Sequence, residues 1–337
     1  MNAVVYTGYG SPDVLKLTEV EKPMPKENEV LIKSFASTVS SVDVTFRSGE
    51  SWSGMLYTGL VNPKRPTLGS TLAGEIEAVG KAVKAFKPGD QVYGTIASFV
   101  SHADYICLPE DGAITSKPAT MSYEEAVAIT PALTALPFLR DDGHIQAGQK
   151  VLINGASGGV GTVAVQLAKY FGADVTGVCS TTKVEFVKSL GADRVIDYTQ
   201  EDFTRNGETY DIIFDVAGKS AFSRCKKALK PNGIYLSTVL STDILLQMAR
   251  TSIIGSKKAV IAFAGLRSAS DQANDLAFLN ELVEEGKIRA TIDSRYPLQE
   301  IVKANRYFDE GSKKGSVVVA VDHGRPSSRR TLQETRQ

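Results

Sequence analysis

The stretch that decides the fold is VLINGASGGVGTVAVQLAKYFGADVTGVCS, residues 151–180. A short apolar run precedes a glycine-rich turn, an amphipathic segment follows the turn, and a second apolar run comes next. This order is typical of a strand, a turn and a helix that returns the chain to a neighbouring parallel strand. We therefore predict strands at 151–154 and 174–179 and a helix at 160–171.

The glycines within this stretch indicate a site for a dinucleotide. Residues 156–161, Ala-Ser-Gly-Gly-Val-Gly, match the G-x-G-x-x-G fingerprint with alanine in its first place. Gly158 would let the backbone approach a diphosphate, and Gly161 would let the helix pack closely on the strand. The helix N-terminus adds unpaired N–H donors and about half a positive charge. The other interpretation is a tight turn without a ligand. A triphosphate P-loop is excluded, because no Lys-Ser or Lys-Thr follows the glycines.

The second apolar run ends in serine, where NAD-preferring domains have an acid about 20 residues after the glycines. Here Ser180 is followed by Thr181, Thr182 and Lys183. A carboxylate would repel a 2′-phosphate, whereas hydroxyls and an ammonium would bind it, and a hydrogen bond to a charged group contributes roughly 1.5–3 kcal/mol. We therefore predict NADPH rather than NADH as the cofactor. The alternative is that Ser180 or Thr181 only caps the next helix.

The rest of the chain divides into a β-rich first third and a region where strands and helices alternate. Runs at 29–37, 72–80, 90–98 and 103–109 predict strands, and turn residues such as those at 87–90 separate them. From Ser122, which forms a capping-box pattern with Glu125, the spacing becomes helical to 143. Strands at 194–197, 211–218, 233–239 and 257–265 alternate with helices at 183–190 and 220–229, which favours a doubly wound parallel sheet. A further helix is expected at 275–288, and residues 326–337 are expected to be a disordered tail.

Composition and charge exclude several classes of protein. The 337 residues carry 38 basic and 38 acidic side chains, and a formal net charge of zero argues against nucleic-acid binding. No segment has the roughly 18 unbroken apolar residues of a membrane span, and the first residues lack the pattern of a secretory signal. Three scattered cysteines predict no disulfide framework. We expect a cytoplasmic, two-domain enzyme with no nucleic-acid or membrane partner.

Several sequence blocks resemble one enzyme family. Short-chain Tyr-Lys catalysis is excluded first, because none of the twelve tyrosines is followed by lysine four residues on. The chain instead resembles the medium-chain dehydrogenase/reductase superfamily, specifically its zinc-free quinone oxidoreductase (zeta-crystallin-like) branch. The blocks follow the family's order as far as about Asp322 and include STVSSVDVTFRSG, RPTLGSTLAGEIEAVG, FKPGDQVYG, ITPALTAL, the glycine stretch, SLGADRVIDY, YDIIFDVAG, LKPNGIYLS and KKGSVVVAVD. So many blocks are specific for the superfamily, though not for a substrate.

The resemblance implies an α/β fold of two domains, one β-rich and one with a parallel sheet, and a cleft for the nicotinamide between them. Residues 1–125 and 269–325 would form a GroES-like domain that carries the substrate, and 126–268 a Rossmann doubly wound parallel-sheet domain. The implied cofactor-binding residues come from the glycine turn, from the 2′-phosphate site and from the cleft: Ser157, Gly158, Gly159, Val160 and Gly161; Ser180, Thr181, Lys183 and Tyr198; Thr134, Val216, Thr238 and Phe263. Phe263 could equally be a core residue.

The resemblance also implies metal-independent chemistry. Zinc-dependent alcohol dehydrogenases of this superfamily have Gly-His-Glu where this chain has Gly69-Ser70-Thr71, and their first cysteine ligand falls near Ser40 and Ser41. Hydroxyls are poor zinc ligands, and without a Lewis acid an alkoxide is not stabilised. We therefore expect hydride transfer from NADPH to a quinone or to an α,β-unsaturated ketone or aldehyde, an enone or enal, without a metal.

Two residues are catalytic candidates. The family usually has Asn-Pro-x-Asp where this chain has Ser40-Ser41-Val42-Asp43, so Ser40 would be the polar group near the reacting end, with a shorter reach. Asp43 fits better as an acceptor for backbone N–H groups than as a general acid. Tyr57 lies in the apolar loop 49–65, which either covers a flat hydrophobic substrate or packs against its own domain.

Two other functions fit the sequence. One is a 2-enoyl thioester reductase of the same superfamily, for which Lys64 and Arg65 could bind coenzyme phosphates. The other is a non-catalytic NADPH-binding protein. The run 257–265 would also form an edge strand of the sheet, where two protomers could pair, so we expect a homodimer.

Overall fold

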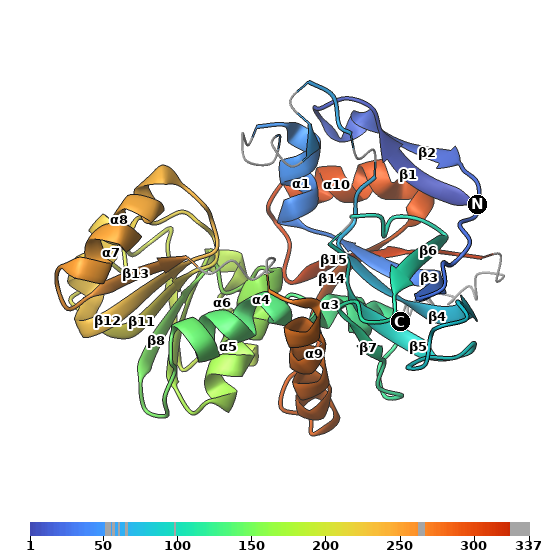
Figure 1. Cartoon of the computed structure of the whole chain (residues 1–337). Coiled ribbons are helices and arrows are strands. Elements are labelled where there is room, and N and C mark those ends of the chain that lie inside the picture. Colours follow the sequence, from blue (N-terminus) through green and yellow to red (C-terminus); the bar gives the residue numbers. More distant parts are fainter. Residues whose placement is uncertain are drawn as a thin grey trace, which may run out of the picture.

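The computed structural model describes residues 1–50, 55, 58–59, 61–64, 67–97, 99–261 and 267–323. Its strands form a six-stranded parallel sheet, a seven-stranded mixed sheet and a small hairpin, and the two large sheets lie side by side (Figure 1). No helix in these described parts of the chain has both the length and the apolar character needed to cross a bilayer.

The parallel sheet follows the doubly wound order β10-β9-β8-β11-β12-β13, as predicted. Its strands are β8 (Lys150–Asn154), β9 (Asp174–Cys179), β10 (Arg194–Asp197), β11 (Tyr210–Asp215), β12 (Leu229–Ser237) and β13 (Lys258–Ile261). Its helices are α5 (Gly159–Tyr170), α6 (Val184–Ser189), α7 (Phe222–Cys225) and α8 (Thr242–Ile253). Val151 and Ile153 of β8 pack in one core cluster and Leu152 in another, because successive strand residues point to opposite faces.

The mixed sheet has the order β14-β15-β3-β4-β5-β7, with β6 paired to β3. Its strands are β3 (Glu29–Val39), β4 (Thr71–Val79), β5 (Gln91–Thr95), β6 (Tyr105–Pro109), β7 (Ile114–Ser116), β14 (Ile292–Pro297) and β15 (Ser316–Ala320). The hairpin is β1 (Asn2–Tyr6) with β2 (Leu15–Glu19), and the helices here are α1 (Ser41–Ser48), α9 (Ala269–Glu284) and α10 (Ile301–Asp309). Because β15 pairs antiparallel with β3, the C-terminal strands complete a sheet begun near the N-terminus.

Several predicted helices have different ends, for local reasons. The helix predicted at 220–229 is only α7 followed by a 3₁₀ turn, and β12 already begins at Leu229. Pro231 follows Lys230 there, and a residue before proline favours extended backbone. The helix predicted at 183–190 begins with a 3₁₀ turn at Thr181–Lys183. The helix predicted at 275–288 is α9, which begins earlier, after the N-cap Ser268.

The helical region after Ser122 is divided by proline. Its two α-helices are α3 (Tyr123–Ile129) and α4 (Ala132–Pro137), and a π-helical turn follows at Phe138–Asp142. The predicted capping box is present, because Ser122 and Glu125 exchange side-chain and backbone hydrogen bonds. Pro131 stands at the junction of α3 and α4, where its missing N–H ends the first helix.

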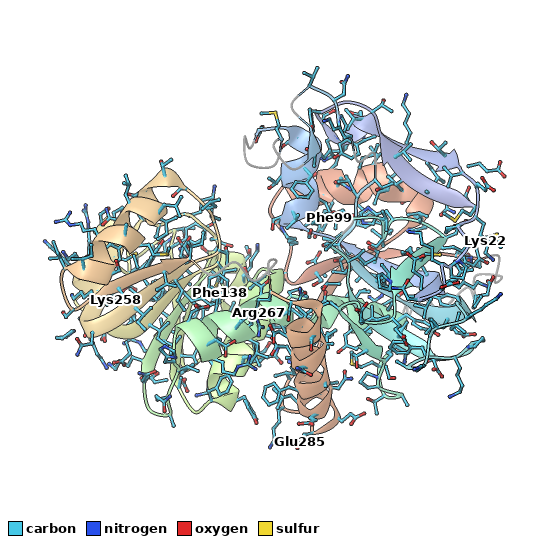
Figure 2. The ribbon with its side chains drawn as sticks, in the orientation of Figure 1. Lys22, Phe99, Phe138, Lys258, Arg267 and Glu285 are labelled. Carbon is cyan, nitrogen blue, oxygen red and sulfur yellow. The ribbon has the colours of Figure 1, made fainter. Side chains whose placement is uncertain are left out.

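The two sheets share one hydrophobic core through α3, α4 and α9. Ala36 and Ala73 of the mixed sheet belong to the same buried cluster as Val163 of α5 and Leu279 of α9. Phe138 at the end of α4 (Figure 2) stacks on another ring of this cluster, with 5.0 Å between ring centroids. Near this packing, Gly158 after β8 forms a backbone bridge with Gly315, the residue before β15.

Candidate active site

The glycine turn connects β8 to α5 in the way that a diphosphate site requires. Gly155, rather than the fingerprint's first position, adopts the left-handed conformation (φ +91°) that lets the chain leave the strand. A β-carbon on Gly161 would lie 2.1 Å from the carbonyl oxygen of Gly155, so the close helix–strand packing predicted for this glycine is confirmed. Gly158 is the N-cap of α5, and no side chain caps the helix.

Gly158 differs from Gly161, because nothing in the protein requires it to be glycine. Its φ of −83° suits any residue, and an added β-carbon would meet only the Gly155 carbonyl oxygen, at 3.6 Å. Gly159 is similar, with its closest neighbour, Ser316 Oγ, also at 3.6 Å. The fold therefore does not require glycine at either position, and no side chain caps the helix N-terminus. The absence of β-carbons here leaves room for an anion to approach the backbone N–H groups. The turn therefore fits a dinucleotide diphosphate.

Strand ends next to the turn bring the predicted cleft residues together. The buried Asn154, at the end of β8, donates from Nδ2 to Asp215 Oδ1 at the end of β11 (2.8 Å). Val216 donates its backbone N–H to the Asn154 carbonyl (3.0 Å), and Thr238 Oγ1 donates to the Val216 carbonyl (3.1 Å). Val216 and Thr238 thus sit at the carboxyl ends of adjacent strands, beside the switch point where ligands bind such sheets. Thr134, half-buried on α4, belongs to the helix that packs along α5.

The residues predicted near a 2′-phosphate also lie together. Ser180 occupies the N-cap position of the 3₁₀ turn after β9, but its side chain makes no capping hydrogen bond. Thr181 Oγ1 donates to Asp197 Oδ2 (2.5 Å), which lowers the pKa of that carboxyl. Tyr198 is 62% exposed, and its backbone N–H donates to the Cys179 carbonyl at the end of β9 (3.0 Å).

Lys183 connects this site to the other sheet. Its Nζ donates to the carbonyl oxygens of Gly311 (3.3 Å) and Lys313 (3.0 Å), in the segment between α10 and β15. Next to it, Gly315 donates its backbone N–H to the Ser157 carbonyl in the glycine turn (2.9 Å). The sequence reasoning missed Lys313. Its signal was the lysine pair in KKGS, directly before the last strand.

Ser40 lies at the N-cap of α1, above a network of buried polar groups. Its hydroxyl donates to Asp43 Oδ2 (2.7 Å), and the fully buried Asp43 also accepts from the backbone N–H of Ser40 (2.8 Å) and of Gly69 (2.8 Å). Asp43 is thus an acceptor for backbone donors, as expected. Thr38 and Thr71 share a hydrogen bond (2.9 Å), and His102 Nε2 lies 3.3 Å from the Thr38 carbonyl oxygen. Tyr57 and Phe263, like Trp52, Leu56 and Arg65, lie outside the described residues.

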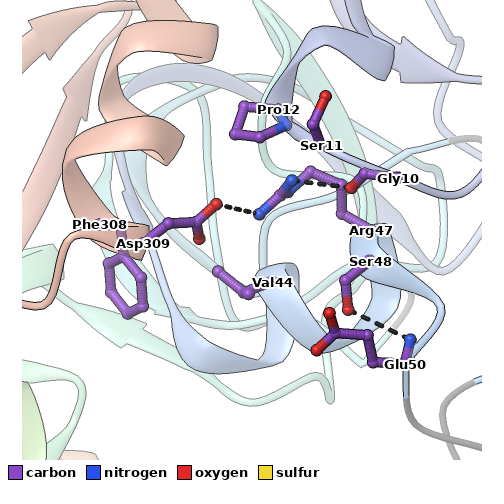
Figure 3. Close-up of a pocket in the computed structure, with 9 residues that line it drawn as sticks. All are labelled: Gly10, Ser11, Pro12, Val44, Arg47, Ser48, Glu50, Phe308 and Asp309. Carbon is purple, nitrogen blue, oxygen red and sulfur yellow. Dashed lines mark hydrogen bonds and ion pairs between the residues drawn. The ribbon is translucent and has the colours of Figure 1, made fainter.

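A cavity of about 680 Å³ lies between α1 and α10, with Arg47 in its wall (Figure 3). The guanidinium is almost fully buried and donates to the Gly10 carbonyl (2.9 Å) and to Asp309 Oδ2 (2.7 Å). Asp309 balances the charge of Arg47, and Glu50 adds a second carboxylate to the lining. The pairing therefore ties the end of α10, which leads to Lys313, to the end of α1.

Comparisons with known proteins agree with this architecture. Residues 26–133 match the family model described as an alcohol dehydrogenase GroES-like domain, and residues 190–319 match one described as a zinc-binding dehydrogenase. The chain is 34% identical to the 2-methylene-furan-3-one reductase of Solanum lycopersicum, over 95% of this chain and 79% of that one.

Two solved structures have the same fold over nearly their full length. The quinone oxidoreductase from Coxiella burnetii superposes with a TM-score of 0.84 at 29% identity, over 96% of this chain and 99% of that one. The Escherichia coli quinone oxidoreductase complexed with NADPH superposes with a TM-score of 0.82 at 25% identity, over 95% of this chain and 100% of that one.

Proposed function

The chain belongs to the medium-chain dehydrogenase/reductase superfamily, in its quinone oxidoreductase branch, and on that premise we propose an NADPH-dependent reductase of quinones and enones. NADPH, when bound, supplies the hydride. The proposal rests on the glycine turn, in which Gly158 and Gly159 have no side chain although the fold would accept one. The site that contains Lys183 lies next to this turn. The names of the similar proteins, a furanone reductase and two quinone oxidoreductases, support the substrate class.

The cofactor-binding residues follow the strand ends. The N–H groups from Gly158 to Gly161 would hold the diphosphate, and Ser180 and Lys183 the 2′-phosphate. Thr134, Val216 and Thr238 would line the nicotinamide end. Asp197 is a carboxylate beside Thr181 and would favour a ribose hydroxyl over a phosphate. The preference for NADPH therefore requires that the attraction of the phosphate by lysine outweighs its repulsion by Asp197.

The reacting end would rely on positioning and hydrogen bonding. When hydride reaches the β-carbon of an enone, negative charge develops on the conjugated oxygen, and a hydrogen-bond donor there stabilises the transition state. Ser40 is our candidate for that donor. Its hydroxyl can turn from Asp43 to the substrate, because Asp43 keeps its two backbone N–H donors. Solvent would then protonate the α-carbon of the enolate, and Tyr57 stays a second candidate for the hydrogen-bond donor.

We also propose that the reaction needs no zinc. At the positions where zinc-dependent relatives have ligands, this chain has Ser40, Ser70 and Thr71, and two of these hydroxyls already have partners in the protein. Among the described residues, no group of three His, Cys, Asp or Glu side chains could hold a metal ion. Hydroxyl oxygens paired in this way are a poor donor set for Zn²⁺.

The domain limits and the assembly are parts of the same proposal. The limits would be 1–125 with 269–325 for the substrate domain and 126–268 for the nucleotide domain. A homodimer would form at β13, which ends the parallel sheet and pairs only with β12 among the described strands. Leu246, Ile253 and Ile254 of the neighbouring α8 region are 71%, 84% and 67% exposed, which supports an interface there. The cytoplasmic location stays a prediction.

One assay tests reaction class, cofactor and metal dependence together. NADPH and NADH oxidation is followed with quinones, an enone, an enal, an enoyl-CoA and a saturated aldehyde, each with and without a chelator. We expect turnover with a quinone or enone, kcat/KM at least about tenfold higher with NADPH than with NADH, and no effect of the chelator. Turnover restricted to the enoyl-CoA would favour a thioester reductase. Tight NADPH binding without any turnover would favour a non-catalytic protein.

A further inference from the structure

Three lysines from two distant parts of the chain gather beside the end of β9. Lys183 comes from the parallel sheet, and Lys313 and Lys314 from the segment that leads into β15 of the mixed sheet. Lys183 Nζ lies 3.0 Å from the Lys313 carbonyl oxygen, and the Lys313 ammonium lies over the Phe308 ring, 3.6 Å from its centroid. Burial and the neighbouring Lys183 charge both lower the pKa of Lys313. The cluster thus holds like charges close together in a half-buried place.

The carboxylates around this cluster have other partners. Asp309 pairs with Arg47 at 2.7 Å. Asp293 accepts from the Tyr307 hydroxyl (2.6 Å) and from the backbone N–H of Lys314 (2.7 Å). Within the described part of the chain, no ion pair closer than 4.0 Å includes any of the three lysine ammonium groups. The Asp293 carboxylate still attracts both Lys183 and Lys313. Three half-buried cations beside this carboxylate leave an excess of positive charge, which favours an anion at the same place.

We propose that Lys313 is a specificity residue for the 2′-phosphate of the cofactor, supplied to the nucleotide site by the substrate domain. This inference rests on the proposed function and deepens it. The anion is identified by its place, because Ser180 and Lys183 follow β9, where the ribose of a dinucleotide lies in such sheets. The Lys313 ammonium lies over the Phe308 ring and the Lys183 ammonium lies at the Lys313 carbonyl oxygen, so the proposal requires both ammonium groups to turn to one phosphate.

The proposal has a structural consequence. The segment that carries Lys313 already contacts the nucleotide site twice, through Lys183 and through the hydrogen bond from Gly315 to Ser157. A 2′-phosphate held by Lys183 and Lys313 would therefore bind to both sheets at once. A cofactor without this phosphate would lose the second sheet's contribution at this point.

The test uses ligands that cannot transfer hydride. Calorimetric titrations of the full chain with adenosine 2′,5′-bisphosphate and with 5′-AMP give two affinities, and their ratio measures the discrimination. Partial unfolding leaves this ratio unchanged, because it reduces binding of both ligands alike. In Lys313→Met we expect this ratio to fall about tenfold, with 5′-AMP affinity within about twofold of the unaltered chain. Lys313→Arg should keep the ratio within about threefold, because the charge remains. Lys303→Met removes an exposed lysine of α10 that pairs with Glu300, and should change nothing.

The possible results separate this inference from the proposed function. If the unaltered chain binds the bisphosphate no better than 5′-AMP, the preference for NADPH fails, and Lys313 has no phosphate to select. If the unaltered chain discriminates and Lys313→Met keeps the full ratio, only the role of Lys313 is overturned. A ratio that falls in Lys313→Met and equally in Lys303→Met would show a general loss of charge and would also overturn it. The salt dependence of bisphosphate affinity should weaken in Lys313→Met alone.

Discussion

At the glycine turn, two glycines three residues apart are glycine for different physical reasons. Gly161 is required by the protein, because a β-carbon there would collide with the backbone of Gly155. Gly158 is not required by the protein, because its conformation and its surroundings would accept alanine, and we propose that a bound diphosphate requires it. Asp43 likewise serves the fold, because its buried carboxylate accepts from the backbone N–H groups of Ser40 and Gly69 and from the Ser40 hydroxyl. Function and folding can therefore be separated one residue at a time.

The first prediction compares Gly158→Ala with Gly161→Ala. The Gly158 variant should keep its free energy of unfolding within about 1 kcal/mol but bind NADPH at least about tenfold more weakly, because the methyl group occupies the path of the diphosphate. The Gly161 variant should lose about 1–3 kcal/mol of stability through overpacking. Urea unfolding and a fluorescence titration with NADPH measure the two effects. Unchanged NADPH affinity in Gly158→Ala would contradict the assigned diphosphate site.

The second prediction concerns pH. Burial lowers the pKa of both Lys183 and Lys313. Because a lysine is cationic only below its pKa, these two lose their charge at a lower pH than an ordinary lysine, whose pKa is about 10.4. The 2′-phosphate stays doubly charged above about pH 6. NADPH affinity should therefore decrease as the pH rises from about 7 to about 10, while NADH affinity changes little. Equal decreases for both cofactors would count against the lysine site.

At the scale of elements, long-range pairs hold helices in place where the local sequence does not. The end of α10 is tied to α1 by Arg47 and Asp309, which lie 262 residues apart in the chain. This pair stands in the wall of the cavity between the two helices (Figure 3). Because α10 leads directly to Lys313, the position of the lysine depends on this anchor. α8 contrasts with α10, since its outward face is apolar and exposed.

The third prediction removes the anchor. Asp309→Ala leaves the buried Arg47 guanidinium with only the Gly10 carbonyl, and should cost about 2–3 kcal/mol of unfolding free energy. The matched control is Asp13→Ala, which breaks the ion pair with Arg306 on the exposed face of the same helix. That change should cost less than about 1 kcal/mol. Adding Arg47→Met to Asp309→Ala should restore part of the loss, because no unpaired charge remains. Equal costs for the two aspartates would refute a special role for the buried pair.

At the scale of the whole molecule, two sheets share one core, and the proposed cofactor site lies between them. α3, α4 and α9 supply the buried residues that join the two units, and the turn at Gly158 meets β15 through a bridge to Gly315. Among the described strands, β13 ends the parallel sheet and pairs only with β12, and it lies beside α8 and its exposed apolar side chains. An open edge next to exposed apolar side chains is a surface that proteins usually cover.

The fourth prediction concerns this surface. Sedimentation velocity should show the chain as a dimer, with twice the mass of one chain, and the double variant Leu246→Asp with Ile253→Asp should sediment as a monomer. Met24→Asp is the control, because Met24 is equally exposed (87%) but lies far from α8 in the mixed-sheet part of the chain. A monomer in the unaltered chain at micromolar concentration would remove the proposed interface.

The sequence by itself determined the local features of this protein. The glycine turn, the capping box at Ser122, the strand at Asp174–Cys179 and the doubly wound order follow from spacing and from residue types that act over a few positions. The family resemblance, carried by whole blocks of sequence, gave the substrate class in the same way. Serine in place of an acid after β9 predicted NADPH because charge repulsion is a local property.

Only the tertiary structure decided which distant residues meet. Lys313 joins Lys183 across 130 residues, and Arg47 finds Asp309 across 262. The sequence analysis did not predict α8, in which only Ile244 and Thr251 are buried. Such contacts depend on the path of the whole chain, above all on the return of β15 to β3. No short window of sequence contains that path, because it results from packing many segments into one core.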